Sequence, residues 1–229
     1  MKTGVYMKKI FIVAGLILLL IISIFTVVRI MDDKTTGIIN WGESVTTQPL
    51  ESETNINVDG WLKITKICEY EGRIALIAEN VSDVDVEYAL LTAKNKNDTF
   101  TFSISALLRG TKVMLICNEP VEFNPDEIYT GWKTENIVNF EKAPEINDDK
   151  YEVSVVDGSI SVRNVSGEDI TSEIFIYYKE KKDDILNGSV THRVRVAGLK
   201  ADAQTYINVS GLNEANCQIL FTEYDDKKI

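Results

Sequence analysis

The longest uninterrupted hydrophobic segment of the chain lies close to its N-terminus. Residues Ile10 to Val28 (IFIVAGLILLLIISIFTVV) form a run of nineteen residues without a charge. As a helix with a rise of about 1.5 Å per residue, this run is roughly 28 Å long, close to the hydrocarbon thickness of a bilayer. The pattern predicts one transmembrane helix over residues 10–29, which places that segment in contact with the lipid bilayer.

A cleaved secretory signal is the main alternative for this segment. The apolar core of such a signal is usually only about 7–15 residues long, and small residues mark its cleavage site. Here the core is longer, and the sequence after it, VVRIMDDKTTG, offers no small-x-small pattern. Lipoprotein processing needs a cysteine directly after the run, whereas the first cysteine is Cys68. We therefore expect an uncleaved signal anchor.

Basic residues that flank the run indicate its orientation, because Lys and Arg are retained on the cytoplasmic side. They are Lys2, Lys8 and Lys9 on the N-terminal side and Arg29 and Lys34 on the C-terminal side. We expect a single-pass protein of the cell membrane, with residues 1–9 in the cytoplasm and the C-terminal body outside it. Residues 1–9 are too few to form a folded signalling domain.

Residues 30–56 are rich in Ser, Thr and Glu and show no sustained periodicity. This composition is typical of a linker. As a flexible coil, the segment reaches roughly 29 Å on average, enough to lift a folded body off the lipid headgroups. We expect a flexible stalk, in which Trp41 either lies at the membrane interface or is an isolated aromatic residue of the linker.

After the stalk, apolar and polar residues alternate with a period of two, which is the pattern of half-buried strands. The segments with this alternation are Val84–Leu90, Phe100–Ser105, Tyr151–Val155 and Thr191–Val196. In the first, the apolar residues 84, 86, 88 and 90 are expected to share the buried face. Asp157-Gly158 and Asn187-Gly188 are typical turn sequences between strands. No long amphipathic helix pattern follows the anchor, so the body is predicted to be mainly β.

An internal repeat indicates how the body is organised. The segment GRIALIAENVSDVDVEYALLTAKNKND, from Gly72, aligns with GSISVRNVSGEDITSEIFIYYKEKKDD, from Gly158. Each has a strand, an Asn-Val-Ser sequence, an acidic turn and an apolar strand, after which the second copy has roughly eight extra residues. The period of about 85 residues predicts two tandem small β-sandwich domains, residues 57–142 and 148–229. One larger domain built from two halves is the alternative.

The second copy also carries a family resemblance. Its order is a strand, Asn-Val-Ser, an acidic turn, Ile-Phe-Ile-Tyr-Tyr, a Val-x-Val strand and Gly-Leu-Lys-Ala. This order resembles the FxLYD-type domains and related clostridial modules, which are small extracellular β-sandwich modules of membrane-anchored bacterial surface proteins. Such modules carry a Gly in the Leu-Lys-x-Gly turn; here the second copy has Asp202 at that place and the first has Gly110. The resemblance implies an Ig-like or FxLYD-like fold and carries over no catalytic residue.

The charge of the body restricts its partners. The chain has 24 basic and 35 acidic residues, a net charge of −11. Residues 1–31 contain four basic residues and no acidic one, so 24 less 4 leaves 20 basic against 35 acidic residues, a net charge of −15 beyond them. A body this negative is repelled by phosphate backbones. Nucleic-acid binding is therefore not expected, whereas solubility beside a membrane or a basic partner is.

The sequence singles out no catalytic, cofactor-binding or metal-binding residue. The single histidine, His192, lies on an alternating strand, where packing is the expected role, and no C-x-x-C sequence is present. Cys68, Cys117 and Cys217 lie beside apolar stretches and are expected to be small buried residues. One disulfide is the alternative outside the cell, with Cys117 and Cys217 as a pair. No phosphate-loop, dinucleotide or nucleophile-elbow motif is found.

Carboxylates and Asn-x-Ser/Thr sequences are the remaining candidates for chemistry. Asp83, Asp85 and Glu87 would project from one side of a strand, and oxygen clusters of this kind can hold calcium, but no glycine-containing calcium loop is present. The Asn-x-Ser/Thr sequences could accept glycans in a secreted chain, yet they are equally at home in β turns. We expect the latter role.

These features predict a membrane-anchored extracytoplasmic protein that binds or scaffolds other envelope components, without catalytic activity and with a protein partner in the envelope. The alternative is an accessory subunit of a membrane secretion, transport or signalling complex, in which the helix packs against partner helices. A hydrolase of cell-wall polymers would need a pair of carboxylates, and the sequence singles out none. The pattern does not identify the ligand or the oligomeric state.

Overall fold

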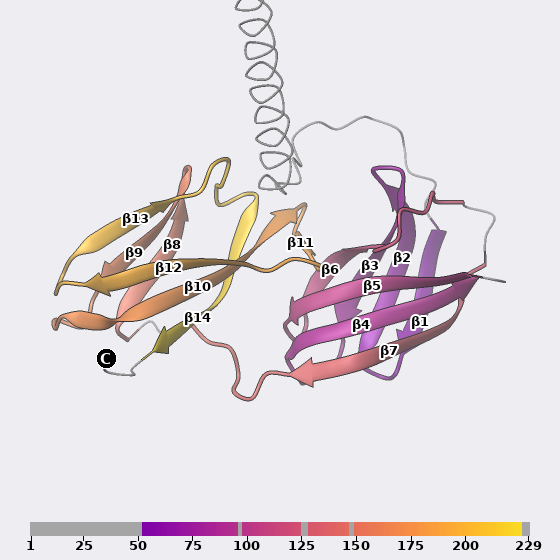
Figure 1. Ribbon diagram of the computed structural model, residues 1–229, viewed down its shortest axis with the longest axis horizontal. Helices are drawn as coiled ribbons and strands as arrows, with labels where there is room; N and C mark the ends of the chain where they lie inside the picture. Colours follow the sequence, from indigo (N-terminus) through magenta and orange to yellow (C-terminus); the bar gives the residue numbers. More distant parts are fainter. Residues whose placement is uncertain (1–51, 96–97, 125–127, 147–148, 226–229) are drawn as a thin grey trace, which may run out of the picture. The chain divides into compact units, whose positions relative to one another are not determined.

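The computed structural model describes residues 52–95, 98–124, 128–146 and 149–225, which contain fourteen β-strands and no α-helix. The prediction of a mainly β body is therefore confirmed. Figure 1 labels the strands. In chain order they are β1 (Ser52–Val58), β2 (Leu62–Tyr70), β3 (Arg73–Asn80), β4 (Val86–Asn95), β5 (Asp98–Leu107), β6 (Lys112–Ile116), β7 (Thr130–Asn139), β8 (Tyr151–Val156), β9 (Ser159–Asn164), β10 (Ile170–Lys182), β11 (Ile185–Asn187), β12 (His192–Leu199), β13 (Gln204–Asn208) and β14 (Cys217–Asp225).

The predicted anchor at residues 10–29, the N-terminal segment 1–9 and most of the stalk lie outside these described residues. Within the described ranges, no helix is long and apolar enough to cross a bilayer. The end of the predicted stalk was wrong, because residues 52–56 belong to β1, which pairs with β2. Only Ile56 and Val58 supply apolar side chains there, a pattern too short to stand out in a polar segment.

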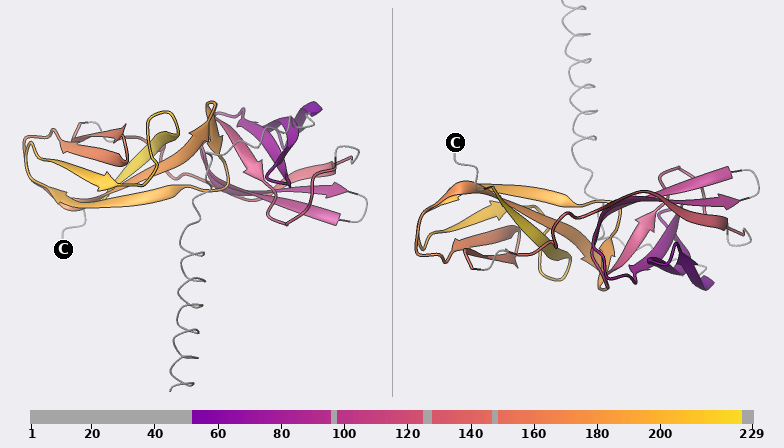
Figure 2. Two further views of the ribbon diagram at one scale, coloured as in Figure 1. Left: turned by 90° about the horizontal axis from the view of Figure 1, so that it is seen from above. Right: turned by 90° about the horizontal axis from the view of Figure 1, so that it is seen from below.

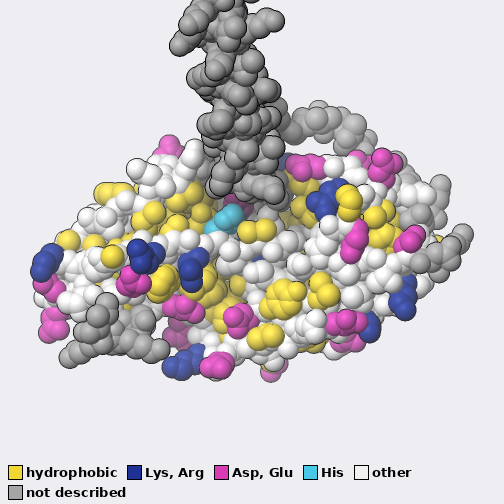
Figure 3. Space-filling view, in the orientation of Figure 1, with side chains coloured by type: hydrophobic (Ala, Val, Ile, Leu, Met, Phe, Trp, Pro, Cys, Tyr) yellow, Lys and Arg dark blue, Asp and Glu magenta, His cyan; other side chains and the backbone are white. Residues whose placement is uncertain are grey.

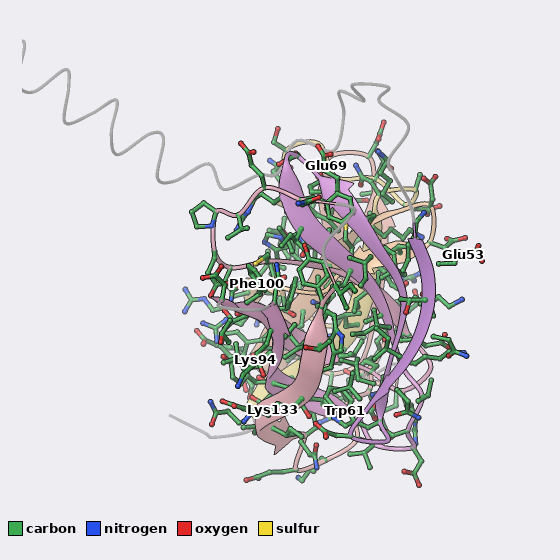
Figure 4. All side chains as sticks on the ribbon, turned by 90° about the vertical axis from the view of Figure 1, so that its right-hand side faces the viewer. Glu53, Trp61, Glu69, Lys94, Phe100 and Lys133 are labelled. Atoms are coloured by element: carbon green, nitrogen blue, oxygen red, sulfur yellow. The ribbon has the colours of Figure 1, made fainter. Side chains whose placement is uncertain are left out.

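The first half of the body is a β-sandwich of two antiparallel sheets. One sheet has the order β1-β2-β3-β6 and the other the order β5-β4-β7. Side chains of both sheets, among them Leu76 and Phe102, fill one core between them. Trp61 links the sheets by donating its indole N–H to Oγ1 of Thr134 on β7 at 3.1 Å. Trp61 and the buried Phe100 lie at different heights of this sandwich (Figure 4).

The second half has the same strand order as the first. Its sheets are β8-β9-β13, matching β2-β3-β6, and β12-β10-β14, matching β5-β4-β7. The two layers of each half separate clearly in the views of Figure 2. Tyr151, Ile160 and Ile174 are among the fully buried residues that form the core of this half.

One short strand connects the sheets of the two halves. β10 turns at Asp183 and Asp184 into β11, which pairs back on the end of β10. On its other side, β11 lies parallel to β6 of the first half, with Leu186 opposite Val113. The halves therefore share one hydrogen-bonded eight-stranded sheet, and Figure 1 shows β11 beside β6.

Both predicted turn sequences lie between strands. Asp157-Gly158 forms the predicted turn between β8 and β9. Asn187-Gly188 ends β11 at a bend and separates it from β12, as predicted, whereas the tight turn between β10 and β11 lies at Asp183 and Asp184. Both of these aspartates have left-handed backbone angles (φ 50° and 63°), a conformation that Asp tolerates better than most residues.

The predicted faces of β4 also need correction. Val86 is buried as expected, but Tyr88 is 40% exposed, and Ala89 and Leu91 occupy the core instead. The pairing of β4 with β7 shifts register between Val86 and Tyr88, and such an irregularity turns the following side chains to the opposite face. The alternation in β5 was correct, since Phe100, Phe102 and Ile104 are all buried.

Candidate functional site

His192 lies on β12, beside the central strand β10. Its ring stacks on Tyr178 with the centroids 5.1 Å apart, and its Nε2 is 3.9 Å from Oε1 of Glu180. On the other side of β10, Cys217 of β14 lies directly opposite Glu180. The fold therefore brings the single histidine and one of the three cysteines to either side of one carboxylate.

The environment of the cysteines is the reverse of what a thiolate nucleophile needs. Burial, followed by the negative charge of Glu180, raises the pKa of Cys217 to about 12. Burial, followed by the hydrogen bond from Sγ to Glu119, raises the pKa of Cys117 to about 11. Reactive cysteines have a lowered pKa. All three cysteines are buried, and the disulfide between Cys117 and Cys217 is not formed.

The carboxylates do not gather into a cation site in the described part of the chain. There, no group of three or more His, Cys, Asp or Glu residues is placed to hold a metal ion. The predicted row of acidic residues on one strand was wrong, because Asp83 and Asp85 lie in the turn before β4 and only Glu87 belongs to the strand. Asp85 instead accepts a hydrogen bond from the backbone N–H of Arg109 at 2.8 Å, which ties two turns together.

The first Asn-Val-Ser sequence organises the turn before β4. The side chain of Asn80 is fully buried, and its Nδ2 donates to the carbonyls of Val84 and Leu107 at 2.8 and 3.1 Å. Its Oδ1 accepts from both the backbone N–H and the hydroxyl of Ser82. A buried amide with these partners serves the turn and is inaccessible to a glycosyl transferase.

The second Asn-Val-Ser sequence repeats this arrangement before β10. Nδ2 of the buried Asn164 donates to the carbonyls of Glu168, Leu199 and Lys200 at 2.6, 3.2 and 3.0 Å. Its Oδ1 accepts from the N–H and the hydroxyl of Ser166. The repeated sequence therefore positions the same turn in both halves, next to the start of each central strand.

At the junction between the halves, segments far apart in the sequence are hydrogen-bonded to one another. The N–H of Gly188, just after β11, donates to the carbonyl of Met114 on β6 at 2.8 Å. Its carbonyl accepts from the N–H of Ser105 on β5 at 2.9 Å, so this glycine bridges both sheets of the first half. A Cβ at position 188 would come within 2.5 Å of Cδ2 of Leu115 and 2.8 Å of Cβ of Val113, which requires a glycine.

Lys179 holds this junction from the side of the second half. Its side chain is 0% exposed, and within the described residues it is the one buried charged side chain. Nζ donates to the carbonyls of Asn187, Gly188 and Val190 at 2.7, 3.3 and 2.9 Å. Three acceptors match the three N–H donors of an ammonium group. Burial lowers the pKa of Lys179 to about 7.

The surroundings of Lys179 decide what its amine can do. A lysine with a lowered pKa can attack carbonyl substrates when a ligand reaches it. This amine is enclosed by protein on all sides, and its donors are occupied by the segment that docks on β6 and β5. Lys179 therefore orders the junction and is not placed to meet a substrate.

Aromatic side chains extend the junction on the same face of β10, toward its neighbour β14. The rings of Tyr177 and Phe221 stack with centroids 4.4 Å apart, and Phe221 meets Phe140, just after β7, edge to face at 5.2 Å. Phe140 and Phe221 also line an open hollow with a volume of about 490 Å³, together with Glu87, Lys142 and Glu223. The stacked and edge-to-face rings make the junction a structural contact first.

Sequence reasoning missed Lys179, although one signal for it was present. The run Ile174 to Tyr178 (IFIYY) is apolar at every position, which indicates a strand covered on both faces. Lys179 follows on the same face as Tyr177, and Tyr177 packs on the core of the first half. The continuous run therefore indicated a second covered face, though not the segment that covers it.

Comparison with known proteins adds nothing to this geometry. No protein family, no curated protein sequence and no solved structure matches the chain significantly.

Proposed function

We propose that this chain is a membrane-anchored, non-enzymatic protein whose extracytoplasmic body binds or scaffolds other components of the cell envelope. The observation that carries the proposal is the junction of β6 with β11, which joins two sandwiches into one hydrogen-bonded sheet. In such a body, one continuous sheet holds the strand edges and loops of both halves. Strand edges and loops are where β modules bind partners. The charge-free run at residues 10–28 would hold the body at the membrane.

We further propose that the two halves are copies of one module of the FxLYD-like type. Their equal strand order supports this, as do the equal hydrogen bonds of Asn80 and Asn164. The turn in which the second copy departs from the family pattern supports it too. Asp202 adopts a left-handed φ of 57°, close to the 69° of Gly110 at the matching place in the first copy.

The surface charge favours a protein partner over an anionic polymer. Asp and Glu side chains are spread over the visible face, with Lys and Arg side chains among them (Figure 3). Such a mixed, net acidic surface repels phosphate and anionic lipid headgroups. The partner in this proposal is therefore an envelope protein with a neutral or basic contact surface.

Protease treatment of intact cells tests the topology on the full chain. With an epitope tag at the C-terminus, we expect added protease to remove the body from intact protoplasts and to leave a membrane-bound stub. A variant that lacks residues 10–29 is the matched control and should leave the membrane fraction. Protection of the body until the cells are lysed would contradict the proposal.

Exchange of the anchor separates this function from that of an accessory subunit in a membrane complex. Residues 10–29 are replaced by an unrelated membrane helix of equal length, and partners are crosslinked from the body in both versions. The proposed function predicts the same crosslinked partners, because the body makes the contacts. Loss of the partners on exchange would favour the subunit of a complex, whose helix makes them.

A further inference from the structure

We infer that the outer edge of β13 is a docking site for an extended strand of a partner protein, which pairs in parallel and carries an apolar residue two positions before a glycine. This inference names the binding surface of the function proposed above, and it rests on that function. Its starting point is that β13 has the same place in the second half as β6 has in the first, where β11 is already seated.

The two strands can be matched residue by residue. In each half, the N–H of the Asn in Asn-Val-Ser donates to the carbonyl just before the strand, which belongs to Thr111 or Ala203. Strand pairing continues from there without a register shift, to β3 in one half and to β9 in the other. Counted from these carbonyls, Met114 of β6 corresponds to Tyr206 of β13.

The count also shows which way the backbone groups point. In an antiparallel pair, successive residues turn their N–H and C=O groups alternately toward and away from the neighbouring strand. The carbonyl of Met114 points away from β3 and accepts from Gly188. By the same count, the N–H and C=O of Tyr206 point away from β9. In the described part of the chain, no strand pairs with β13 on that side, and Tyr206 is 58% exposed.

The composition of β13 sets it apart from the other strand edges. Edge strands commonly carry charges that discourage pairing with another chain. Among the described edges, β13 (QTYIN) has neither a charge nor a proline. Figure 4 labels two of the charged residues on other edges, Glu53 and Lys133. The edge strands with charges are β1 (Glu53), β5 (Asp98), β7 (Lys133), β8 (Glu152), β12 (Arg193) and β14 (Glu223).

The occupied edge indicates what an occupant of β13 must look like. At β6, Leu186 enters the core, and Gly188 passes so close to Val113 and Leu115 that no Cβ fits. β13 has Thr205 and Ile207 at the matching positions, which are also branched. A strand that approaches β13 as β11 approaches β6 therefore needs an apolar residue, any residue and then a glycine.

A synthetic peptide tests this requirement on the purified full chain in detergent micelles. The probe is the labelled octapeptide DILNGSVT, the sequence of residues 184–191. We expect saturable binding with a dissociation constant on the order of 0.1–1 mM, since a short flexible strand loses much conformational freedom on binding. The same peptide with valine in place of glycine should not bind, because its side chain meets the branched residues of β13.

Substitutions of Tyr206 place the peptide on the edge. Tyr206→Pro removes the outward N–H without touching the ladder to β9, and proline is tolerated on edge strands. We expect binding about tenfold weaker in this variant, and unchanged binding in the matched Tyr206→Met, which has the residue of β6. Hydrogen exchange in the unmodified protein gives a second measurement: the peptide should slow exchange at residues 204–208 and leave β8 unaffected.

Three results would overturn the inference. The first is that the peptide shows no saturable binding. The second is that Tyr206→Pro leaves binding unchanged and residues 204–208 gain no protection from exchange. The third is that the protein self-associates and Tyr206→Pro abolishes the self-association, because a second copy of the chain would then be the occupant. These measurements in micelles do not depend on membrane orientation. A negative result here therefore leaves the anchored topology standing, and a negative protease test leaves the result at this edge standing.

Discussion

The two halves share a strand order, but they are completed in different ways. The core of the first half includes Leu186, Leu220 and Phe221, all from the second half, and the partly buried Tyr177 packs against it. Among the described residues, the core of the second half consists of its own residues alone, such as Tyr151 and Ile174. The contact between the halves is therefore asymmetric: the first half depends on the second, whereas the reverse dependence is slight.

This difference shows how the second half has a structural role that the first half lacks. The extra residues after β10 form β11 and the docking segment of Gly188, and they occur only in the second half. They add a strand to the sheet of the first half, and their carbonyls bind the buried Lys179. In the first half, which has no such insertion, β4 and β5 pair from Asn95 and Asp98 onward.

The largest effect is expected from Leu186→Ala. Leu186 belongs to the second half in sequence but is buried in the core of the first, so its truncation should lower the free energy of unfolding by about 2–5 kcal/mol. Urea unfolding followed by tryptophan fluorescence measures the effect, because Trp61 and Trp132 both lie in the first half. Hydrogen exchange should become faster in β3 and β6.

Leu212→Ala is the matched control for that experiment, since Leu212 is buried in the core of the second half. It should speed exchange in β8 and β9 more than in β3. The asymmetry between the halves would be disproved if both substitutions loosened both halves to the same extent.

Lys179→Met should have the next largest effect. Methionine fills a similar volume but leaves the carbonyls of Asn187 and Val190 without their buried donor. The cost of such unsatisfied groups is about 2–3 kcal/mol in unfolding free energy, measured by urea unfolding. The exposed Lys182→Met is the control and should change stability little. A Lys179 variant as stable as the control would show that the junction does not need the buried amine of Lys179 as a hydrogen-bond donor.

The pH dependence of stability should also distinguish Lys179. Its pKa rises from about 7 in the folded protein to the ordinary 10.5 on unfolding, so the unfolded chain binds more protons between these values. Stability then increases with pH from about 7 upward, by at most about 1.4 kcal/mol per pH unit, and below pH 7 this contribution is constant. Lys179→Met should lack this increase when the two proteins are compared between pH 7 and 9.

Above pH 9 the cysteines act in the opposite direction. The pKa values of Cys117 and Cys217 are raised in the folded state, so the unfolded thiols lose their protons first and stability falls. The comparison is therefore limited to pH 7–9. Identical pH profiles of the two proteins in that range would contradict the role given to Lys179.

The smallest expected effect concerns the matching turns at Gly110 and Asp202. Both have left-handed backbone angles, which cost a residue with a side chain more than they cost glycine. Asp202→Gly should raise the free energy of unfolding by about 0.5 kcal/mol, and Gly110→Asp should lower it by about 0.5–1 kcal/mol. Thermal unfolding of the two variants beside the unmodified chain measures both, and shifts of equal sign would show that the turns are not equivalent.

Local features of the body could be predicted from the sequence because they depend on near neighbours. The alternation of Phe100, Phe102 and Ile104 follows from the pleat of a single strand, and it was correct. The turns at Asn80 and Asn164 rest mostly on bonds within four residues, together with one or two carbonyls from the next turn.

The junction could not be predicted in the same way, for two physical reasons. The pairing of Leu186 with Val113 joins residues far apart in the chain through a strand of three residues, too short to show a period. Lys179 has the character of a surface residue, and only the enclosing segment makes it a buried one. The register shift that exposes Tyr88 likewise depends on the partner strand β7 and not on β4 alone.

The placement of Leu186 and Phe221 has a consequence for the order in which a newly made chain acquires structure. Synthesis proceeds from the N-terminus, so the strands of the first half emerge well before the residues that complete their core. At about 5–20 residues per second, β6 waits roughly 5–20 s for Phe221. During that interval the edge of β6 and the apolar surface beside it are open to chaperones and to wrong partners. The first half can therefore complete its core only after the second half has been synthesised.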